Sequence, residues 1–194
     1  MFRPRSVRLR DGRVAVIRRA VARDARAVLA HANAVGRERI YTMTERLRLT
    51  ERQEWAVFRA ADGRAGIYLV ATIDGTVCGT ATFTRGRVPK MWHVVTLGIA
   101  LGRTARGVGL GTAMMHAGTD WARSVGARKM TLGVFATNTR ALRLYRGLGY
   151  RVEGRLRHQA VVAGRPVDEL LMALWLRPFP AAHAGRARPA RRPR

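Results

Sequence analysis

Short stretches in which apolar and polar residues alternate predict a chain rich in strands. The expected strands run over residues 13–18, 67–73, 76–84, 92–101, 129–136, 150–162 and 167–176. Asp74-Gly75 joins the second strand to the third and is typical of a two-residue hairpin turn. Gly98 interrupts the fourth strand, and a glycine there often marks a bulge or the close approach of another backbone or a ligand.

Apolar residues at helical spacing predict the helices between these strands. They cover residues 21–35, 50–61, 109–125 and 138–148. Thr50 begins a Thr-Glu-Arg-Gln capping-box pattern that favours a helix start, whereas residues 36–49 are expected to form mostly loop. The order of the elements predicts one mixed α/β domain around a single sheet, and it differs from the regular βαβ alternation of a doubly wound fold.

The length of 194 residues favours one domain with short appendages. We expect an irregular, basic N-terminal segment over residues 1–13 and a folded domain over residues 14–177. Residues 178–194 are expected to form a disordered tail, because their Ala, Arg, Pro and Gly residues cannot bury enough apolar area.

The single cysteine, Cys78, excludes an internal disulfide and a cysteine-based metal site. No apolar stretch approaches the roughly 18–20 residues that span a bilayer, and no hydrophobic region of a secretory signal follows the basic N-terminus. We therefore expect a cytoplasmic protein with no metal and no membrane insertion.

The charge is unusual, with 37 basic and 12 acidic residues and a net charge of +25. The Arg-rich ends, residues 1–13 and 178–194, carry only part of this excess. Such a charge attracts polyanions at low salt, so the ends predict nonspecific binding of nucleic acid or another polyanion. A composition that simply favours arginine, with a solvated basic surface, is the open alternative.

A glycine-rich segment, Arg106 to Thr112, follows the fourth strand and opens a helix. Backbone N–H groups at a helix start lack partners within the helix, and the helix dipole favours an anion there. Closely spaced glycines let a phosphate reach these groups, so the segment predicts a pyrophosphate site; a tight packing turn is the alternative. The Gly-Lys-Ser/Thr of a P-loop is absent, and Thr112 stands where a dinucleotide fingerprint needs its third glycine.

Two motifs, in matching order and spacing, resemble those of the GNAT superfamily of N-acetyltransferases. Arg106, Gly109 and Gly111 match its Arg-x-x-Gly-x-Gly acetyl-CoA signature. An Asn-x-x-Ala-x-x-Leu-Tyr motif followed by Gly-Tyr runs from Asn138 to Tyr150. The resemblance covers roughly residues 14–176. It implies an α+β fold with a mixed, mostly antiparallel central sheet, flanked by helices and splayed between its fourth and fifth strands.

The resemblance implies acetyl-CoA as co-substrate, with its pyrophosphate on the amides of residues 107–112. The pantetheine arm would pair like an extra strand with the edge at residues 99–101. Asn138 would contact this arm or cap its helix, and Arg106 and Arg140 would face the phosphates. The cofactor-binding residues implied are Ile99, Ala100, Leu101, Arg106, Gly107, Val108, Gly109, Leu110, Gly111, Thr112, Asn138 and Tyr145.

The resemblance also implies direct attack of an amine on the thioester, with a backbone N–H of residues 98–101 binding the oxyanion. Tyr145, at the family's tyrosine position, would give a proton or hydrogen bond to the departing thiolate. Because an alkyl amine is protonated at neutral pH, a base is needed. Many relatives carry Glu on the strand before the cofactor turn, but this chain has Thr96 in that region.

Few residues can substitute for that base. Glu45 is expected at the acceptor site as base, water-relay partner or amine anchor, and is the second catalytic candidate beside Tyr145. His93 points away from the side of Thr96 and is a weaker candidate. The other nearby acids are expected as surface charges on a helix, Glu51 and Glu54, or as charges of the last hairpin near the acceptor mouth, Asp168 and Glu169.

The sequence therefore predicts an acetyl-CoA-dependent N-acetyltransferase that acts in a ternary complex on a small amine, an amino acid, or a peptide or protein amine. A homodimer is compatible with this prediction. Two alternatives use the same fold: a basic protein bound to nucleic acid or the ribosome, and a CoA-binding regulator without catalysis.

Overall fold

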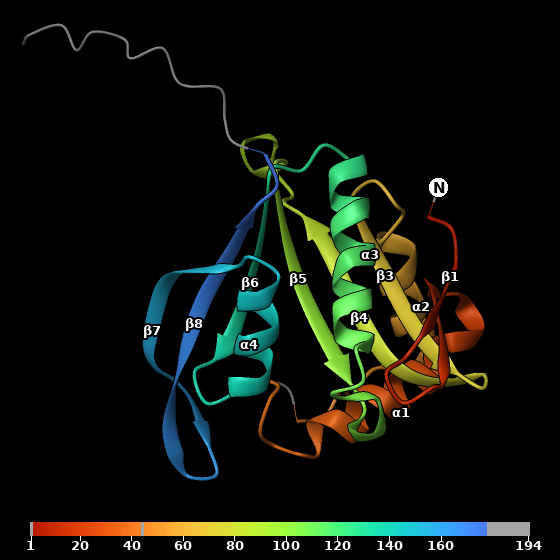
Figure 1. Cartoon of the computed structure of the whole chain (residues 1–194), viewed down its shortest axis with the longest axis horizontal. Coiled ribbons are helices and arrows are strands. Elements are labelled where there is room, and N and C mark those ends of the chain that lie inside the picture. The colour runs from red at the N-terminus through yellow and green to blue at the C-terminus, as the bar shows by residue number, and fades with distance from the viewer. Residues whose placement is uncertain (1, 44, 178–194) are drawn as a thin grey trace, which may run out of the picture.

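The chain folds around one sheet in the computed structural model, which describes residues 2–43 and 45–177. These residues form eight strands in the order β1-β2-β3-β4-β5-β6-β8-β7, and only β5 and β6 pair in parallel (Figure 1). The strands are β1 (Arg5–Arg8), β2 (Val14–Arg19), β3 (Gly66–Ile73), β4 (Thr76–Arg85), β5 (Val94–Leu101), β6 (Lys129–Phe135), β7 (Arg151–Val162) and β8 (Arg165–Trp175). The expected mixed, mostly antiparallel sheet is confirmed.

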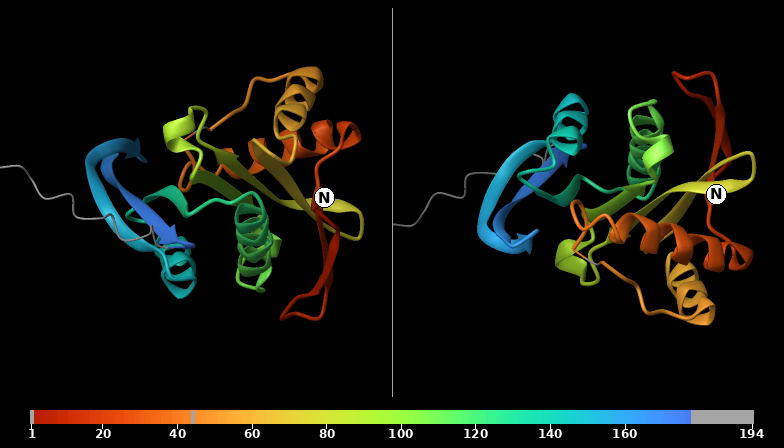
Figure 2. Two further views of the ribbon diagram at one scale, coloured as in Figure 1. Left: turned by 90° about the horizontal axis from the view of Figure 1, so that it is seen from above. Right: turned by 90° about the horizontal axis from the view of Figure 1, so that it is seen from below.

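Helices cover both faces of the sheet. They are α1 (Ala25–Gly36), α2 (Glu51–Ala60), α3 (Leu110–Ser124) and α4 (Thr139–Gly147). Helices α1 and α2 lie on one face and α3 and α4 on the other (Figure 2). The capping box before α2 forms as expected, because Thr50 accepts a hydrogen bond from the Gln53 amide and the Gln53 side chain accepts one from the Thr50 amide. None of the described helices is long and apolar enough to cross a bilayer.

The N-terminal segment departs from its expected irregularity. Strand β1 pairs antiparallel with β2, and Leu9, which is 4% exposed, packs into the core. The Arg10 amide then donates a hydrogen bond of 3.0 Å to the Val108 carbonyl. The four residues of β1 are too few, and too rich in arginine, for a pattern of alternation to show. The predicted tail, residues 178–194, lies outside the described residues.

The glycine inside β5 does not produce a bulge. The β4–β5 register runs without a shift through the pair Thr82 and Gly98, and register shifts occur instead between Ala71 and Thr72 on β3 and at two places on β7. The turn between β7 and β8 is shorter than the expected four residues, 163–166. It consists of Ala163 and Gly164, which have positive φ values of 49° and 75°.

The predicted splay is present between β5 and β6, which are the fourth and fifth of the expected strands because β1 was not among them. The two strands pair only from Val94 to Thr96 on β5, opposite Lys129 to Thr131 on β6. Beyond these residues they diverge, and the gap widens toward the start of α3 (Figure 1). The edge of β5 that faces β6 is therefore open from Leu97 onward.

The contact between α3 and the sheet yields a stability prediction. An ideal Cβ on Gly118 would lie 1.9 Å from the Cζ of Phe83, a side chain with no exposed surface. Gly118→Ala should therefore destabilise the fold by about 1–3 kcal/mol through overpacking. Thermal unfolding should show a Tm lower by roughly 2–10 °C. Gly147→Ala is the matched control, because a Cβ there meets nothing within 4 Å; equal Tm values for the two variants would contradict the close packing.

Candidate active site

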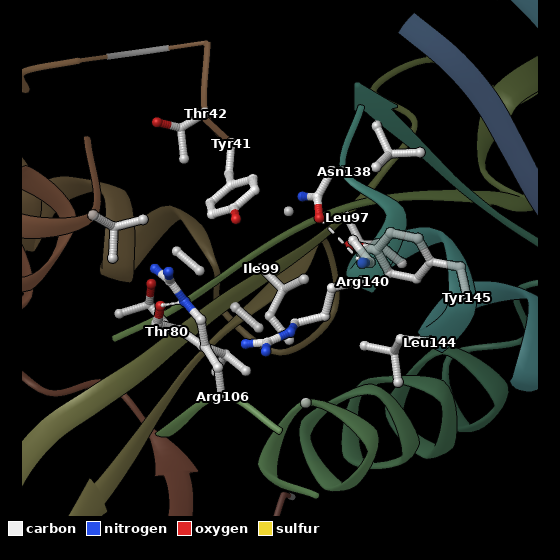
Figure 3. A pocket seen from close by; sticks show the side chains of 18 of the residues that line it. Tyr41, Thr42, Thr80, Leu97, Ile99, Arg106, Asn138, Arg140, Leu144 and Tyr145 are labelled. Atoms are coloured by element: carbon white, nitrogen blue, oxygen red, sulfur yellow. Dashed lines mark hydrogen bonds between the residues drawn. The ribbon is translucent and has the colours of Figure 1, made fainter. Parts of the chain in front are cut away.

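A cavity of about 650 Å³ opens where β5 and β6 part. Its lining includes residues 97–101 of β5, the start of α3, helix α4, the loop before α2 and the first half of β8. Figure 3 shows Tyr41 and Thr42 on one side of this cavity and Asn138, Leu144 and Tyr145 on the other. The cavity thus joins segments that are far apart in the sequence.

The glycine-rich segment forms one end of the cavity as a row of unpaired amides. Gly107 and Gly109 have φ values of 81° and 93°, in the left-handed region that favours glycine, and Gly109 caps α3. The first amide bonded within this turn is that of Ala113, which donates to the Gly109 carbonyl. Within the described chain, the amides of residues 107–112 donate no hydrogen bond. They can therefore bind an anion.

The residues of this segment divide into those that line the cavity and those that do not. Gly107, Gly109, Gly111 and Thr112 line the cavity. Val108 and Leu110 are not among the lining residues, and the Leu110 side chain is fully buried in the core. For those two residues only the backbone remains to serve a ligand.

Two arginines flank the row of amides. Arg140 extends from the first turn of α4 into the cavity (Figure 3). Arg10 also lines the cavity, and its Cγ lies 3.9 Å from an ideal Cβ on Gly109. Sequence reasoning missed Arg10, because only the tertiary contact of the N-terminal segment with Val108 brings it here.

Arg106 lines the cavity but is held by an acidic partner. Its guanidinium donates two hydrogen bonds of 2.7 Å to the Glu38 carboxylate and one of 2.8 Å to the Leu101 carbonyl. Its Cζ also lies 5.4 Å from the centroid of the Tyr41 ring. The pair ties the loop after α1 to the end of β5, so Arg106 is a positioning residue as well as a neighbour of the amides.

This pair predicts a pH-dependent contribution to stability. The hydrogen bonds from Arg106 lower the pKa of Glu38 below its ordinary value of 4.5, against the opposing effect of burial. A depressed pKa stabilises the folded state above pH 4.5, and this stabilisation is lost as the pH falls through the folded-state pKa. Denaturant unfolding of the parent and of Glu38→Gln should therefore differ most near neutrality and converge at acid pH. A constant difference from pH 7 to pH 3 would contradict this role.

Helix α4 supplies the predicted asparagine and tyrosine. Asn138 caps the helix, because its Oδ1 accepts a 3.1 Å hydrogen bond from the Ala141 amide. Tyr145 is 6% exposed, and its ring centroid lies 5.8 Å from that of Tyr150. No described residue forms a hydrogen bond with the Tyr145 hydroxyl, and burial raises the pKa of this group to about 12. The group is therefore a protonated phenol at neutral pH.

Two acidic residues, Glu45 and Glu54, lie elsewhere than expected. Glu45 is absent from the cavity lining; its exposed carboxylate lies 3.0 Å from the Arg39 guanidinium. Glu54, expected on the surface, is 3% exposed, and its pKa is raised by burial, an effect that a hydrogen bond with Tyr68 partly offsets. Thr96 also lies outside the lining, with its hydroxyl 3.3 Å from that of Thr131. Glu169, expected as a hairpin charge, lines the cavity.

This arrangement agrees with the comparison with known proteins. A family model described as the acetyltransferase (GNAT) family matches residues 21–150. The chain belongs to this family. GNAT membership makes it an acyltransferase by class. Strands β7 and β8 follow the matched region, and Glu169 lies on β8.

Individual GNAT proteins resemble the chain in sequence and in structure. The L-amino acid N-acetyltransferase AaaT of Escherichia coli is 33% identical over 120 residues, which cover 59% of this chain and 72% of that protein. A GNAT acetyltransferase from Streptococcus pneumoniae superposes with a TM-score of 0.78 at 26% identity, covering 83% of this chain and 98% of that one. A phosphinothricin acetyltransferase from Sinorhizobium meliloti, solved with acetyl-CoA, has a TM-score of 0.75 at 25% identity, covering 84% and 89%.

Among the described residues, no three His, Cys, Asp or Glu side chains lie where they could share a metal ion. The polar groups of the cavity are instead amides, hydroxyls, guanidinium groups and one carboxylate.

Proposed function

We propose that the chain is an acetyl-CoA-dependent N-acetyltransferase that transfers the acetyl group to a primary amine by direct attack in a ternary complex. The observation that carries this proposal is the row of unpaired amides at residues 107–112, which shares one cavity with the protonated phenol of Tyr145. The acetyl-CoA in the Sinorhizobium meliloti structure supports the choice of co-substrate.

The residues at one end of the cavity fit a diphosphate. The amides of residues 107–112 would bind it, and the glycines among them leave room for its approach. Arg10 and Arg140 would add charge-assisted hydrogen bonds at the flanks. Arg106 would act mainly by holding the loop through Glu38, and not as a free cation facing the phosphates.

The pantetheine arm would lie along the open edge of β5. Successive residues of a strand direct their backbone groups to opposite edges. Val94 and Gly102 bond toward β4 and His93 bonds toward the start of β6, so Leu97, Ile99 and Leu101 present their backbone groups to the open edge. The Leu101 carbonyl already accepts from Arg106. We therefore expect the arm to pair with the backbone groups of Leu97 and Ile99 and with the N–H of Leu101.

The chemical step would use groups of this chain at two points. A backbone N–H of residues 98–101 would donate a hydrogen bond to the oxyanion that develops at the thioester carbonyl. The Tyr145 hydroxyl would donate one to the departing thiolate sulfur, and its raised pKa keeps it in the donating form. Asn138 would hold the start of α4, and through it the ring of Tyr145.

The acceptor is proposed only as a chemical class, a primary amine. The AaaT protein named for L-amino acids supports an α-amine as the first compound to test. Because an α-amine has the lower pKa, its deprotonation at pH 7 costs roughly 3 kcal/mol less free energy than that of an alkyl amine.

A thiol-release assay tests this function. The purified full chain is incubated with acetyl-CoA and a panel of amino acids, small amines and peptides, and free thiol is measured against time. The proposal predicts release that depends on enzyme and amine, together with a mass gain of one acetyl group on the amine. Tight acetyl-CoA binding without turnover on any amine would favour the alternative of a non-catalytic regulator.

The remaining expectations stay predictions: a cytoplasmic location, a homodimer, polyanion binding through the Arg-rich ends and Glu45 as a base. The exposed position of Glu45 beside Arg39 gives no support to its catalytic role.

A further inference from the structure

The positively charged and negatively charged side chains that line the cavity lie in different parts of it. Arg10 and Arg140 flank the row of amides, and Arg106 is paired with Glu38. Among the described lining residues, Glu169 alone is acidic. The cavity therefore offers positive charge where we place the diphosphate and a single carboxylate on the β8 side.

The Glu169 side chain is directed into the cavity by the sheet. Glu169 pairs with Phe135 on β6, two residues from Gly133 on the same strand. An ideal Cβ on Gly133 would lie 1.9 Å from Oε1 of Glu169, so the carboxylate fills the space that the missing side chain leaves. Gly133 lines the same cavity. Any other residue at position 133 would push the carboxylate away.

The neighbouring acid has a structural role and leaves Glu169 as the available one. Asp168 accepts a 2.6 Å hydrogen bond from Nε of Arg155 and a 2.8 Å hydrogen bond from the His158 amide. No described residue forms an ion pair or side-chain hydrogen bond with Glu169. Its carboxylate is therefore free to bind a cation from the cavity.

The position of this carboxylate coincides with the point where the strands part. The last paired residues are Thr96 and Thr131, whose hydroxyls lie on one face of the sheet. Gly133 follows Thr131 by two residues, so it presents the same face at a distance of about 7 Å along β6. The carboxylate of Glu169 thus stands over that face, just beyond the start of the open β5 edge.

We propose that Glu169 is the carboxylate that binds the ammonium group of the acceptor and takes a proton from it. This inference rests on the proposed acetyl transfer and names a base for it. One proton passes from the ammonium to the carboxylate, and the neutral nitrogen forms the C–N bond. The C–S bond then breaks, the Tyr145 hydroxyl gives its proton to the departing sulfur, and the second proton of the nitrogen restores the Tyr145 hydroxyl. Glu169 finally releases its proton to solvent, so the carboxylate is restored.

The acceptor class follows from this assignment. The site selects a cationic primary amine, because a lone carboxylate attracts an ammonium and repels an acidic group placed next to the nitrogen. Among α-amines of equal size, those whose carboxyl group is blocked as an amide or ester should therefore be turned over more efficiently than the free amino acids.

Steady-state kinetics of Glu169→Gln at saturating acetyl-CoA test the assignment. The variant keeps the shape of the side chain and removes its charge. We expect kcat/KM for the preferred amine to fall about 10- to 100-fold, the effect of losing a charge-assisted hydrogen bond. The Kd of acetyl-CoA should change less than twofold. Glu153→Gln is the matched control, because its exposed carboxylate pairs with Lys129 outside the cavity; it should behave as the parent.

A second variant guards against a failure of the first to fold. Gly133→Ala keeps the carboxylate but displaces it, so it should lower kcat/KM for the amine while acetyl-CoA still binds. Parent-like kcat/KM in Glu169→Gln or in a folded Gly133→Ala would overturn the role of Glu169 and leave acetyl transfer intact. Absence of turnover by the parent on every amine would instead overturn acetyl transfer, and with it this role.

Discussion

Tyr145→Phe is expected to lower kcat by about 10²- to 10⁴-fold, the contribution typical of a positioned acid. The ring is 6% exposed and packs beside Tyr150, so phenylalanine keeps the contacts of the ring. Only the hydroxyl is lost, and within the described structure it has no hydrogen bond whose removal would disturb the fold. The Kd of acetyl-CoA and the Tm should therefore remain close to those of the parent.

Tyr150→Phe provides the matched control for this result. Tyr150 has no exposed surface, and its hydroxyl donates only a weak 3.9 Å contact to the sulfur of Met130. Burial raises the pKa of Tyr150 as well, so both hydroxyls are protonated, but of the two only Tyr145 lines the cavity. A Tyr145→Phe enzyme as active as Tyr150→Phe would remove the acid role.

Gly109→Ala is expected to weaken acetyl-CoA binding about 100-fold. At φ 93° an alanine is strained by roughly 1–2 kcal/mol, and the turn can relieve the strain only by rotating the neighbouring amides. Each misdirected charge-assisted hydrogen bond costs a further 1.5–3 kcal/mol or so. Calorimetric titration of the variant with acetyl-CoA measures this change in Kd.

Gly126→Ala separates this effect from a loss of stability. Gly126 follows the other end of α3, has a φ of 77°, and its Cβ would meet nothing within 4 Å. It introduces similar backbone strain far from the row of amides. We expect a comparable fall in Tm for both variants and a weaker Kd only for Gly109→Ala; an equal change in Kd would contradict the assignment of the amides.

Features set by neighbours in the chain could be predicted from the sequence. The spacing of Gly107 and Gly109 specifies the left-handed turn before α3, and Asn138 caps the helix that carries Tyr145. Each depends on backbone conformation over a few residues. The splay between β5 and β6 was implied by the family resemblance and could not be read from local patterns.

Features that depend on distant contacts could not be predicted. Arg10 reaches the amides because its own backbone bonds to Val108, almost a hundred residues away in the chain. Glu169 enters the cavity because strand pairing places it beside Gly133, which has no side chain to exclude it. Glu54 was expected on the exposed surface of its helix, yet its side chain is buried and forms a hydrogen bond with Tyr68. No periodicity in the sequence reports such packing.

The most direct test is calorimetric titration of the purified full chain with acetyl-CoA, paired with thermal unfolding. We predict a saturable heat signal and a Tm that rises with acetyl-CoA concentration, because a ligand that binds only the folded state stabilises it. Both signals should weaken in Gly109→Ala and persist in Gly126→Ala. A parent chain that gives neither heat nor a shift in Tm at saturating acetyl-CoA would contradict the claim that the amides of residues 107–112 bind its diphosphate.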